Sequence, residues 1–287
     1  MSLRPEPDIL WHYTDANGMF GILGSRQFRF GDAGFLNDCT ERVYGKEVVD
    51  RVFVEEIAAG DEDGLLSDLR KHVQVSRSSD RIFVCSFSAT KECISQWQRY
   101  GVDGTGYCLG FDAKGLDALF DKDMINRVPM LYEEAEQKEY LRKKIRRGVD
   151  TYRRKVAIAA PEDRNRGINL YDAIFTAGDV DDAGLRLKNP FFADEQEWRY
   201  FERVDEDRLG DDDSDEEFAV RGAYVKPFMR FPRMPKRGTL TQLPVVDIVC
   251  GPRLDVDIAK PTVERLLQFY GHVNVNVERS ALTSIWR

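Results

Sequence analysis

Short β-prone runs alternate with amphipathic helical stretches along the whole chain, and this alternation restricts the fold more than any other feature. The sequence predicts strands at 9–13, 28–30, 82–87, 106–111, 128–132, 191–202, 219–231, 245–250 and 273–278. It predicts helices after Asp15 or Asn17 and at 41–57, 65–75, 94–100, 116–120, 134–159, 170–177 and 261–270. Because strands and helices interleave without an internal repeat or a linker, we expect one domain over residues 1–287 of the mixed α/β, or α+β, class.

Two segments differ from this pattern. The long charged helix opens a helical stretch, about 134–187, that is predicted to be an insertion packed beside the sheet. Residues 205–217 are strongly acidic with almost nothing apolar, which predicts a flexible loop. The helix concentrates lysine and arginine at 138–154, either as a contact surface for an anionic partner or as a solvated helix face.

Composition excludes several classes of protein. No stretch approaches the roughly 18 apolar residues of a membrane span, and the first residues lack the apolar centre of a secretory signal, so we expect a cytoplasmic protein without membrane contact. The five cysteines lack close pairing, and the three histidines lack metal-ligand spacing, so no metal is expected. The net charge of −8 disfavours broad binding to nucleic acid through phosphates.

His12 is the only histidine placed for chemistry. It follows two apolar residues at the end of the first predicted strand, where its side chain can point into a cleft. The alternative is a structural histidine that is hydrogen bonded within the fold.

Two pairs of polar residues also occur at strand ends. Ser86 and Ser88 alternate with Phe87, so both hydroxyls face the same side of an extended strand, where they could instead cap nearby backbone groups. Glu195 and Glu197 share a face in the same way, and their mutual repulsion requires a cation or a ligand hydroxyl. Arg199 lies on that face too and could neutralise them in a salt-bridge ladder.

Several motifs taken together resemble an uncharacterised bacterial domain family over nearly the whole chain. They are WHYTD, FLNDCTE, VCSFS, SQWQRYG with GYCLGFD, EQEWRYF, and VVDIVCGP with SALTSIWR. That family has no established activity to carry over. Its motif order is similar to that of the ADP-ribosyltransferase superfamily, and this resemblance implies a split mixed β-sheet with flanking helices that grips NAD.

The resemblance also implies roles for individual residues. His12, with Tyr13 and Thr14 beside it, would contact the ribose of NAD, and Ser86 and Ser88 would support the nicotinamide side. Glu197 would be the catalytic residue that stabilises the cationic ribosyl centre. Glu195 would orient the acceptor.

The predicted function is therefore NAD-dependent ADP-ribosyl transfer to an unknown protein or nucleic-acid acceptor, as in a toxin or a phage-defence effector. An NAD glycohydrolase would differ only in using water as the acceptor. The alternative from another class is a non-catalytic binding domain on the same fold, with the basic helix as its contact surface. The enzyme hypothesis requires His12, Ser86 and Glu197 to converge within about 10 Å around one cleft, and it fails if they lie on different faces.

Overall fold

A computed structural model describes residues 5–35, 41–61, 63–75, 80–121, 123, 125–158, 180, 183–205, 209, 215–221, 223–234 and 241–284. Two sequence predictions fall mainly outside these residues: the helix at 170–177 and the acidic loop at 205–217.

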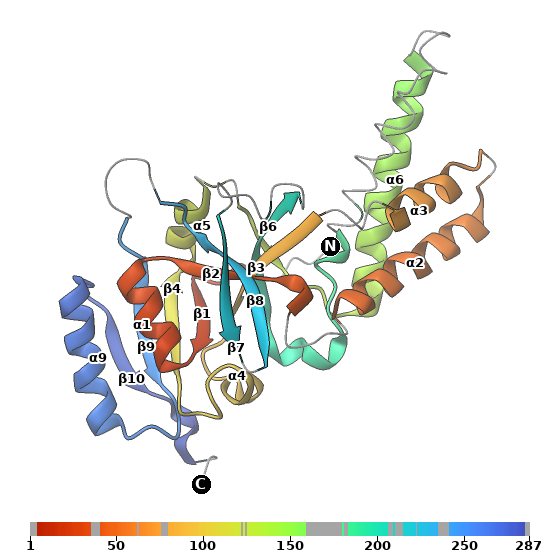
Figure 1. Cartoon of the computed structure of the whole chain (residues 1–287). Coiled ribbons are helices and arrows are strands. Elements are labelled where there is room, and N and C mark those ends of the chain that lie inside the picture. The colour runs from red at the N-terminus through yellow and green to blue at the C-terminus, as the bar shows by residue number, and fades with distance from the viewer. Residues whose placement is uncertain are drawn as a thin grey trace.

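The strands form one large mixed sheet (Figure 1). They are β1 (Ile9–Thr14), β2 (Phe28–Asp32), β3 (Asp80–Ser88), β4 (Tyr107–Asp112), β5 (Arg127–Pro129), β6 (Glu197–Asp205), β7 (Glu216–Arg221), β8 (Tyr224–Phe231), β9 (Val245–Cys250) and β10 (Asn276–Arg279). Their order is β10-β9-β4-β1-β3-β2-β8-β7, and β6 pairs with β3 and β5. The β9–β10 pair is parallel, whereas the other strand pairs are antiparallel.

The sheet forks along one edge of β3. Strand β6 pairs with β3 from Asp80 to Ser88 and so occupies one edge completely. The other edge is shared, because β2 pairs with it at Phe83 and Val84 whereas β1 pairs with it only at Ser88. Strands β1 and β2 therefore separate beside the middle of β3.

The helices are placed on both sides of the sheet and beyond its end. They are α1 (Ala16–Ser25), α2 (Glu41–Ala59), α3 (Leu65–Val75), α4 (Ile94–Arg99), α5 (Ala113–Asp121), α6 (Glu134–Ile158) and α9 (Val256–Tyr270), with 3₁₀ helices η1 (Ala33–Phe35), η3 (Pro190–Glu195) and η5 (Ala281–Ser284). Asp15, one of the two predicted caps, begins α1 by accepting a hydrogen bond from the amide of Gly18 at 2.6 Å.

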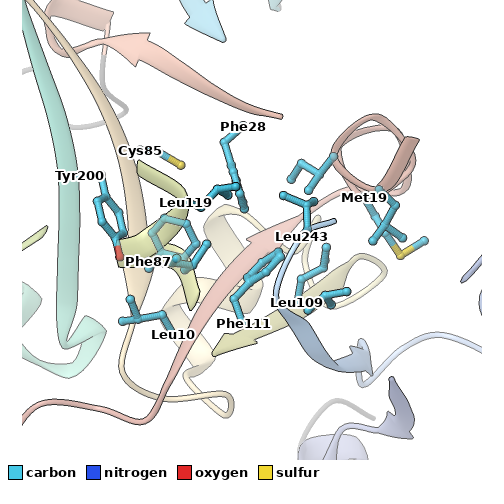
Figure 2. Packing of buried hydrophobic residues seen from close by; sticks show 14 of the residues in the cluster. Leu10, Met19, Phe28, Cys85, Phe87, Leu109, Phe111, Leu119, Tyr200 and Leu243 are labelled. Carbon is cyan, nitrogen blue, oxygen red and sulfur yellow. The ribbon is translucent and has the colours of Figure 1, made fainter. Parts of the chain in front are cut away.

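The main hydrophobic core lies between one face of the sheet and helices α1, α5 and α9. Figure 2 shows Phe28, Phe87 and Phe111 from three different strands packed in this core. On the opposite face, α4 covers a smaller cluster in which Trp97 packs against Tyr13 with ring centroids 5.0 Å apart. Alternate residues of β1, β4 and β9 therefore enter two different apolar layers.

A second core joins α2, α3 and α6 into a helical unit that extends away from the sheet (Figure 1). The predicted insertion at about 134–187 supplies α6, and the described residues 41–75 complete the unit. Three cations of α6 pair with α2: Lys138 and Arg142 bond Glu55 at 2.8 and 2.5 Å, and Arg146 bonds Glu56 at 3.0 Å. Part of the basic run at 138–154 therefore neutralises acidic residues of the neighbouring helix.

Several element boundaries differ from the sequence prediction. The run at 191–202 is a strand only from Glu197, because Pro190–Glu195 form the 3₁₀ helix η3. The run at 219–231 is not one strand but the β7–β8 hairpin, because the chain turns between Arg221 and Tyr224. The last long helix begins at Val256, capped by Asp255, and carries Pro261 in its interior instead of at its start.

Candidate functional site

Strands β3 and β6 bring the Ser-x-Ser and Glu-x-Glu motifs together. In their register Ser86 lies opposite Arg199, and Ser88 lies opposite Glu197. Residues directly opposite each other in an antiparallel pair project from the same face of the sheet. The structure therefore places the side chains of Ser86, Ser88 and Glu197 on one face, although the motifs are far apart in sequence.

Glu195 reaches this face by a different route from the predicted one. It does not continue the strand but ends the 3₁₀ helix η3, and Gln196 between the two glutamates has a left-handed backbone with φ of 44°. The two carboxylates converge on the ammonium group of Lys188, which bonds Glu195 Oε2 at 2.5 Å and also bonds Glu197 Oε2. The repulsion that the sequence predicts is thus removed by a buried lysine.

Two arginines complete the ionic cluster, which we define as Arg99, Lys188, Glu195, Glu197 and Arg199. Arg199 makes a bidentate contact with Glu197, from Nε to Oε1 at 2.6 Å and from a terminal nitrogen to Oε2 at 2.9 Å. Arg99 bonds Glu195 Oε1 at 2.9 Å. The side chain of Arg99 is 43% exposed, whereas that of Glu195 is 1% exposed. The cluster is buried except where Arg99 reaches the surface.

Neighbouring charges set the ionisation of Glu197. Burial by itself raises the pKa of this carboxyl, but the charges and hydrogen bonds of Arg199 and Lys188 outweigh it and lower the pKa to about 2. Glu197 is therefore ionised near neutral pH and is not poised to donate a proton. Nearby, burial and the charge of Glu197 raise the pKa of Tyr100 to about 12, so this phenol stays protonated.

Ser88 serves the backbone at the end of its strand. Its hydroxyl donates to the carbonyl oxygen of Glu195 at 2.7 Å and accepts from the amide of Thr90 at 3.1 Å. This is the capping alternative that the sequence left open for Ser88.

His12 lies on the other face of the sheet. Trp11 pairs with Ser88 and so shares its face, which directs the next residue, His12, to the opposite face. There the His12 ring contacts the rings of Phe87 and Phe28, with centroids 5.4 and 6.0 Å away. The expectation that His12, Ser86 and Glu197 converge around one cleft is therefore wrong.

The backbone contact of His12 explains its position in the fork of the sheet. Its Nδ1 lies 3.0 Å from the carbonyl oxygen of Ser86, in the stretch of β3 between the β2 and β1 pairings. Tyr13, on the Trp11 side, donates its hydroxyl to the carbonyl of Thr90 at 3.0 Å. Thr14 follows at the end of β1, two residues beyond His12 and on its face.

We expect His12→Leu to lower the free energy of unfolding by about 1–3 kcal/mol, because it removes the hydrogen-bond partner of a part-buried carbonyl. Urea denaturation of both proteins measures the difference. His12→Asn, which keeps a donor, should recover part of the loss. Equal stability of all three proteins would contradict a structural role.

Sequence reasoning missed Lys188 and did not connect Arg99 with the glutamates. Lys188 is 4% exposed and precedes η3 without any local pattern that marks it. The available signal was indirect, since two carboxylates close together inside a protein require cations. Which cations meet the carboxylates depends on how η3 and α4 pack. These two helices contact each other through Arg99 of α4, whose guanidinium carbon lies 4.6 Å from the ring centroid of Phe192 in η3.

Within the described residues, no group of three or more histidine, cysteine or acidic side chains is arranged to hold a metal ion. The four cysteines of this part of the chain are buried free thiols. None of the described helices has the length and apolar character needed to cross a membrane.

Comparison with known proteins relates this region to a family without assigning it an activity. Residues 96–200 match the model of a family described as protein of unknown function, DUF2971. All five residues of the ionic cluster lie within this match, whereas His12, Ser86 and Ser88 lie outside it. No curated protein and no solved structure matches the chain.

Proposed function

We propose that this chain is a binding domain that recognises an anionic group at Arg99, and that the anion is the pyrophosphate of NAD. The observation that carries the proposal is the position of Arg99, half exposed at the surface and anchored below by the buried Glu195. The Phe192 ring holds the guanidinium from another side. An arginine fixed in this way is preorganised for bidentate contact with phosphate oxygens.

The charge of the cluster also supports an anionic ligand. Arg99, Lys188 and Arg199 carry three positive charges, and Glu195 and Glu197 carry two negative ones, which leaves one positive charge. Buried ionic groups are weak contributors to stability, since desolvation offsets most of their attraction. Their concentration beside an exposed arginine is therefore typical of a ligand site.

We expect Arg99→Gln to weaken NAD binding by about ten-fold or more, because it removes a charge-assisted contact to phosphate. Isothermal titration calorimetry with NAD measures the dissociation constant, and nicotinamide riboside, which lacks the pyrophosphate, should bind weakly to both proteins. Arg51→Gln is a matched control, because the Arg51 side chain is 49% exposed and pairs with Glu134 in the helical unit. Equal affinity of wild type and Arg99→Gln for NAD would overturn the proposal.

An ADP-ribosyltransferase acting on an unknown macromolecular acceptor, as a toxin or a phage-defence effector, is the second candidate. It is favoured by the meeting of Ser88 with Glu197 across β3 and β6. In that reaction the bond between the ribose and nicotinamide breaks, nicotinamide leaves with the electron pair, and an acceptor nucleophile attacks the ribose and loses its proton. Glu197 would have to leave Lys188 to stabilise the cationic ribose, whereas both of its oxygens are ion-paired in this structure.

Nicotinamide release from NAD separates the two candidates. It is measured for wild type and Glu197→Gln, each with and without cell lysate. Release that needs Glu197 and rises with lysate would indicate a transferase, and release that ignores lysate would indicate a glycohydrolase. NAD binding without release is the result that the binding domain predicts.

A further inference from the structure

Asp194 is an exposed acid beside the buried glutamate that holds Arg99. It precedes Glu195 in η3, and its side chain lies at the surface whereas that of Glu195 is buried. One oxygen of its carboxylate, Oδ2, accepts a hydrogen bond from the hydroxyl of Ser95 in α4 at 2.7 Å. Its backbone carbonyl accepts from the thiol of Cys93 at 3.5 Å. These contacts fix the position of the Asp194 carboxylate.

The packing of η3 on α4 places this carboxylate close to the Arg99 guanidinium. Ser95 and Arg99 are four residues apart in α4, so they lie on one face of the helix about one turn apart. Asp194 bonds the first of these residues, and the next residue of η3, Glu195, bonds the second. The surface where η3 meets α4 therefore presents a carboxylate and a guanidinium as neighbours.

Neither charged group uses all of its hydrogen-bonding atoms inside the protein. Among the described residues, Arg99 has one hydrogen-bond partner, Glu195, which leaves Nε and one terminal nitrogen as donors. Within the same part of the chain, the Asp194 carboxylate makes its contacts through Oδ2, which leaves Oδ1 as an acceptor. A ligand that binds here therefore meets donors on Arg99 and an ionised acceptor on Asp194.

We propose, as an extension of the NAD binding proposed above and dependent on it, that Asp194 accepts hydrogen bonds from hydroxyl groups of the ribose next to the pyrophosphate. A carboxylate repels phosphate oxygens, but it accepts strong hydrogen bonds from hydroxyl groups. In NAD each end of the pyrophosphate is joined to a ribose, so the first donors beyond the phosphates are ribose hydroxyls. The site then recognises a phosphate and a sugar together, and not phosphate alone.

Inorganic pyrophosphate, which has no ribose, separates the two contacts. Isothermal titration calorimetry measures its dissociation constant and that of NAD for wild type and Asp194→Ala. The variant should bind NAD about ten-fold more weakly, because it lacks an ionised acceptor. It should bind pyrophosphate as tightly as wild type or more tightly, because a negative charge beside the anion is removed. Retained pyrophosphate binding also shows that the site is folded.

Two results would overturn the ribose contact. One is equal affinity of wild type and Asp194→Ala for NAD, and the other is an equal loss of affinity for both ligands. Asp68→Ala is the matched control, because the Asp68 side chain is 67% exposed and pairs with Lys71 in the helical unit. It should leave both affinities unchanged, and an effect on NAD as large as that of Asp194→Ala would mean that net charge alone is responsible.

Arg99→Gln distinguishes failure of the ribose contact from failure of the proposed function. It should weaken both NAD and pyrophosphate, because both ligands carry the phosphates. If Arg99→Gln weakens NAD binding and Asp194→Ala does not, the phosphate contact stands and only the ribose contact is wrong. If wild type binds no NAD, or binds it without need of Arg99, both proposals are wrong.

Ser95 is a positioning residue in this arrangement, because it acts on the ligand only through Asp194. Ser95→Ala should weaken NAD binding less than Asp194→Ala does and should leave pyrophosphate binding unchanged. In the Asp194→Ala background it should have no further effect on NAD binding, since the group that it positions is already absent. An additional loss in the double variant would contradict this role.

Discussion

Lys188→Met will lower the free energy of unfolding by about 3–5 kcal/mol, because it leaves two buried carboxylates without their shared cation. Lys188 Nζ contacts both Glu195 and Glu197, and these side chains are 1% and 5% exposed. Methionine fills a similar volume but supplies no charge. Urea denaturation followed by circular dichroism measures the loss.

Lys143→Met provides the matched control. The Lys143 side chain is 57% exposed and pairs with Glu139 one helical turn away, an arrangement worth only about 0.3–0.5 kcal/mol. If both variants lost about the same stability, the cluster around Lys188 would not be the buried ionic centre described above.

The same pair of proteins has an expected dependence on pH. The folded-state pKa of Glu197 is lowered to about 2, so its contribution to stability is present above the unfolded pKa of about 4.3 and is lost as the pH falls toward 2. In the Lys188→Met variant, protonation of Glu197 removes the negative charge that has lost its lysine partner. The stability difference between wild type and Lys188→Met should therefore shrink on acidification, and a difference that grows would contradict the assignment.

Phe28→Ala will also lower the free energy of unfolding by about 3–5 kcal/mol, because it opens a cavity in the main core. Phe28 has no exposed surface, and its ring lies 5.5 Å from that of Phe87 and 5.1 Å from that of Phe111. Thermal and urea unfolding measure the change. Since the His12 ring also contacts Phe28, the substitution loosens the fork of the sheet as well.

Phe269→Ala is the control for this second prediction. Phe269 is also a phenylalanine, but it is 80% exposed on α9. Its replacement by alanine should therefore change the free energy of unfolding by less than about 0.5 kcal/mol. A small effect at Phe28 would mean that the core between β2 and α5 is loosely packed.

Local patterns were sufficient to predict most elements. The apolar patterns at 9–13, 41–57, 65–75, 82–87 and 245–250 correspond to β1, α2, α3, β3 and β9. Local reasoning failed at 219–231, where alternation continues across a turn and therefore cannot separate one strand from a hairpin. It also gave no sign that α2 and α3 share a core with α6, since packing between distant helices leaves no local period.

The candidate site was predictable only in part. Period-two alternation was enough to place Ser86 and Ser88 on one face, and electrostatics was enough to require a cation or a ligand hydroxyl beside Glu195 and Glu197. Alternation within β1 could not say that His12 would point away from them, because the face of each strand depends on its register with its neighbours. The single pairing of Trp11 with Ser88 decides that question.

The sequence by itself determined the mixed α+β class, most of the strands and helices, and the need to neutralise the two glutamates. These properties depend on residues close together in the chain. The sequence also offered Arg199 as a neutralising partner, and Arg199 bonds Glu197. Only the tertiary structure decided that Lys188 and Arg99 supply the other neutralising charges, that His12 lies on the opposite face, and that the sheet forks at β3. The reason is that strand register and the approach of distant segments are set by the packing of the whole core, which no local pattern encodes.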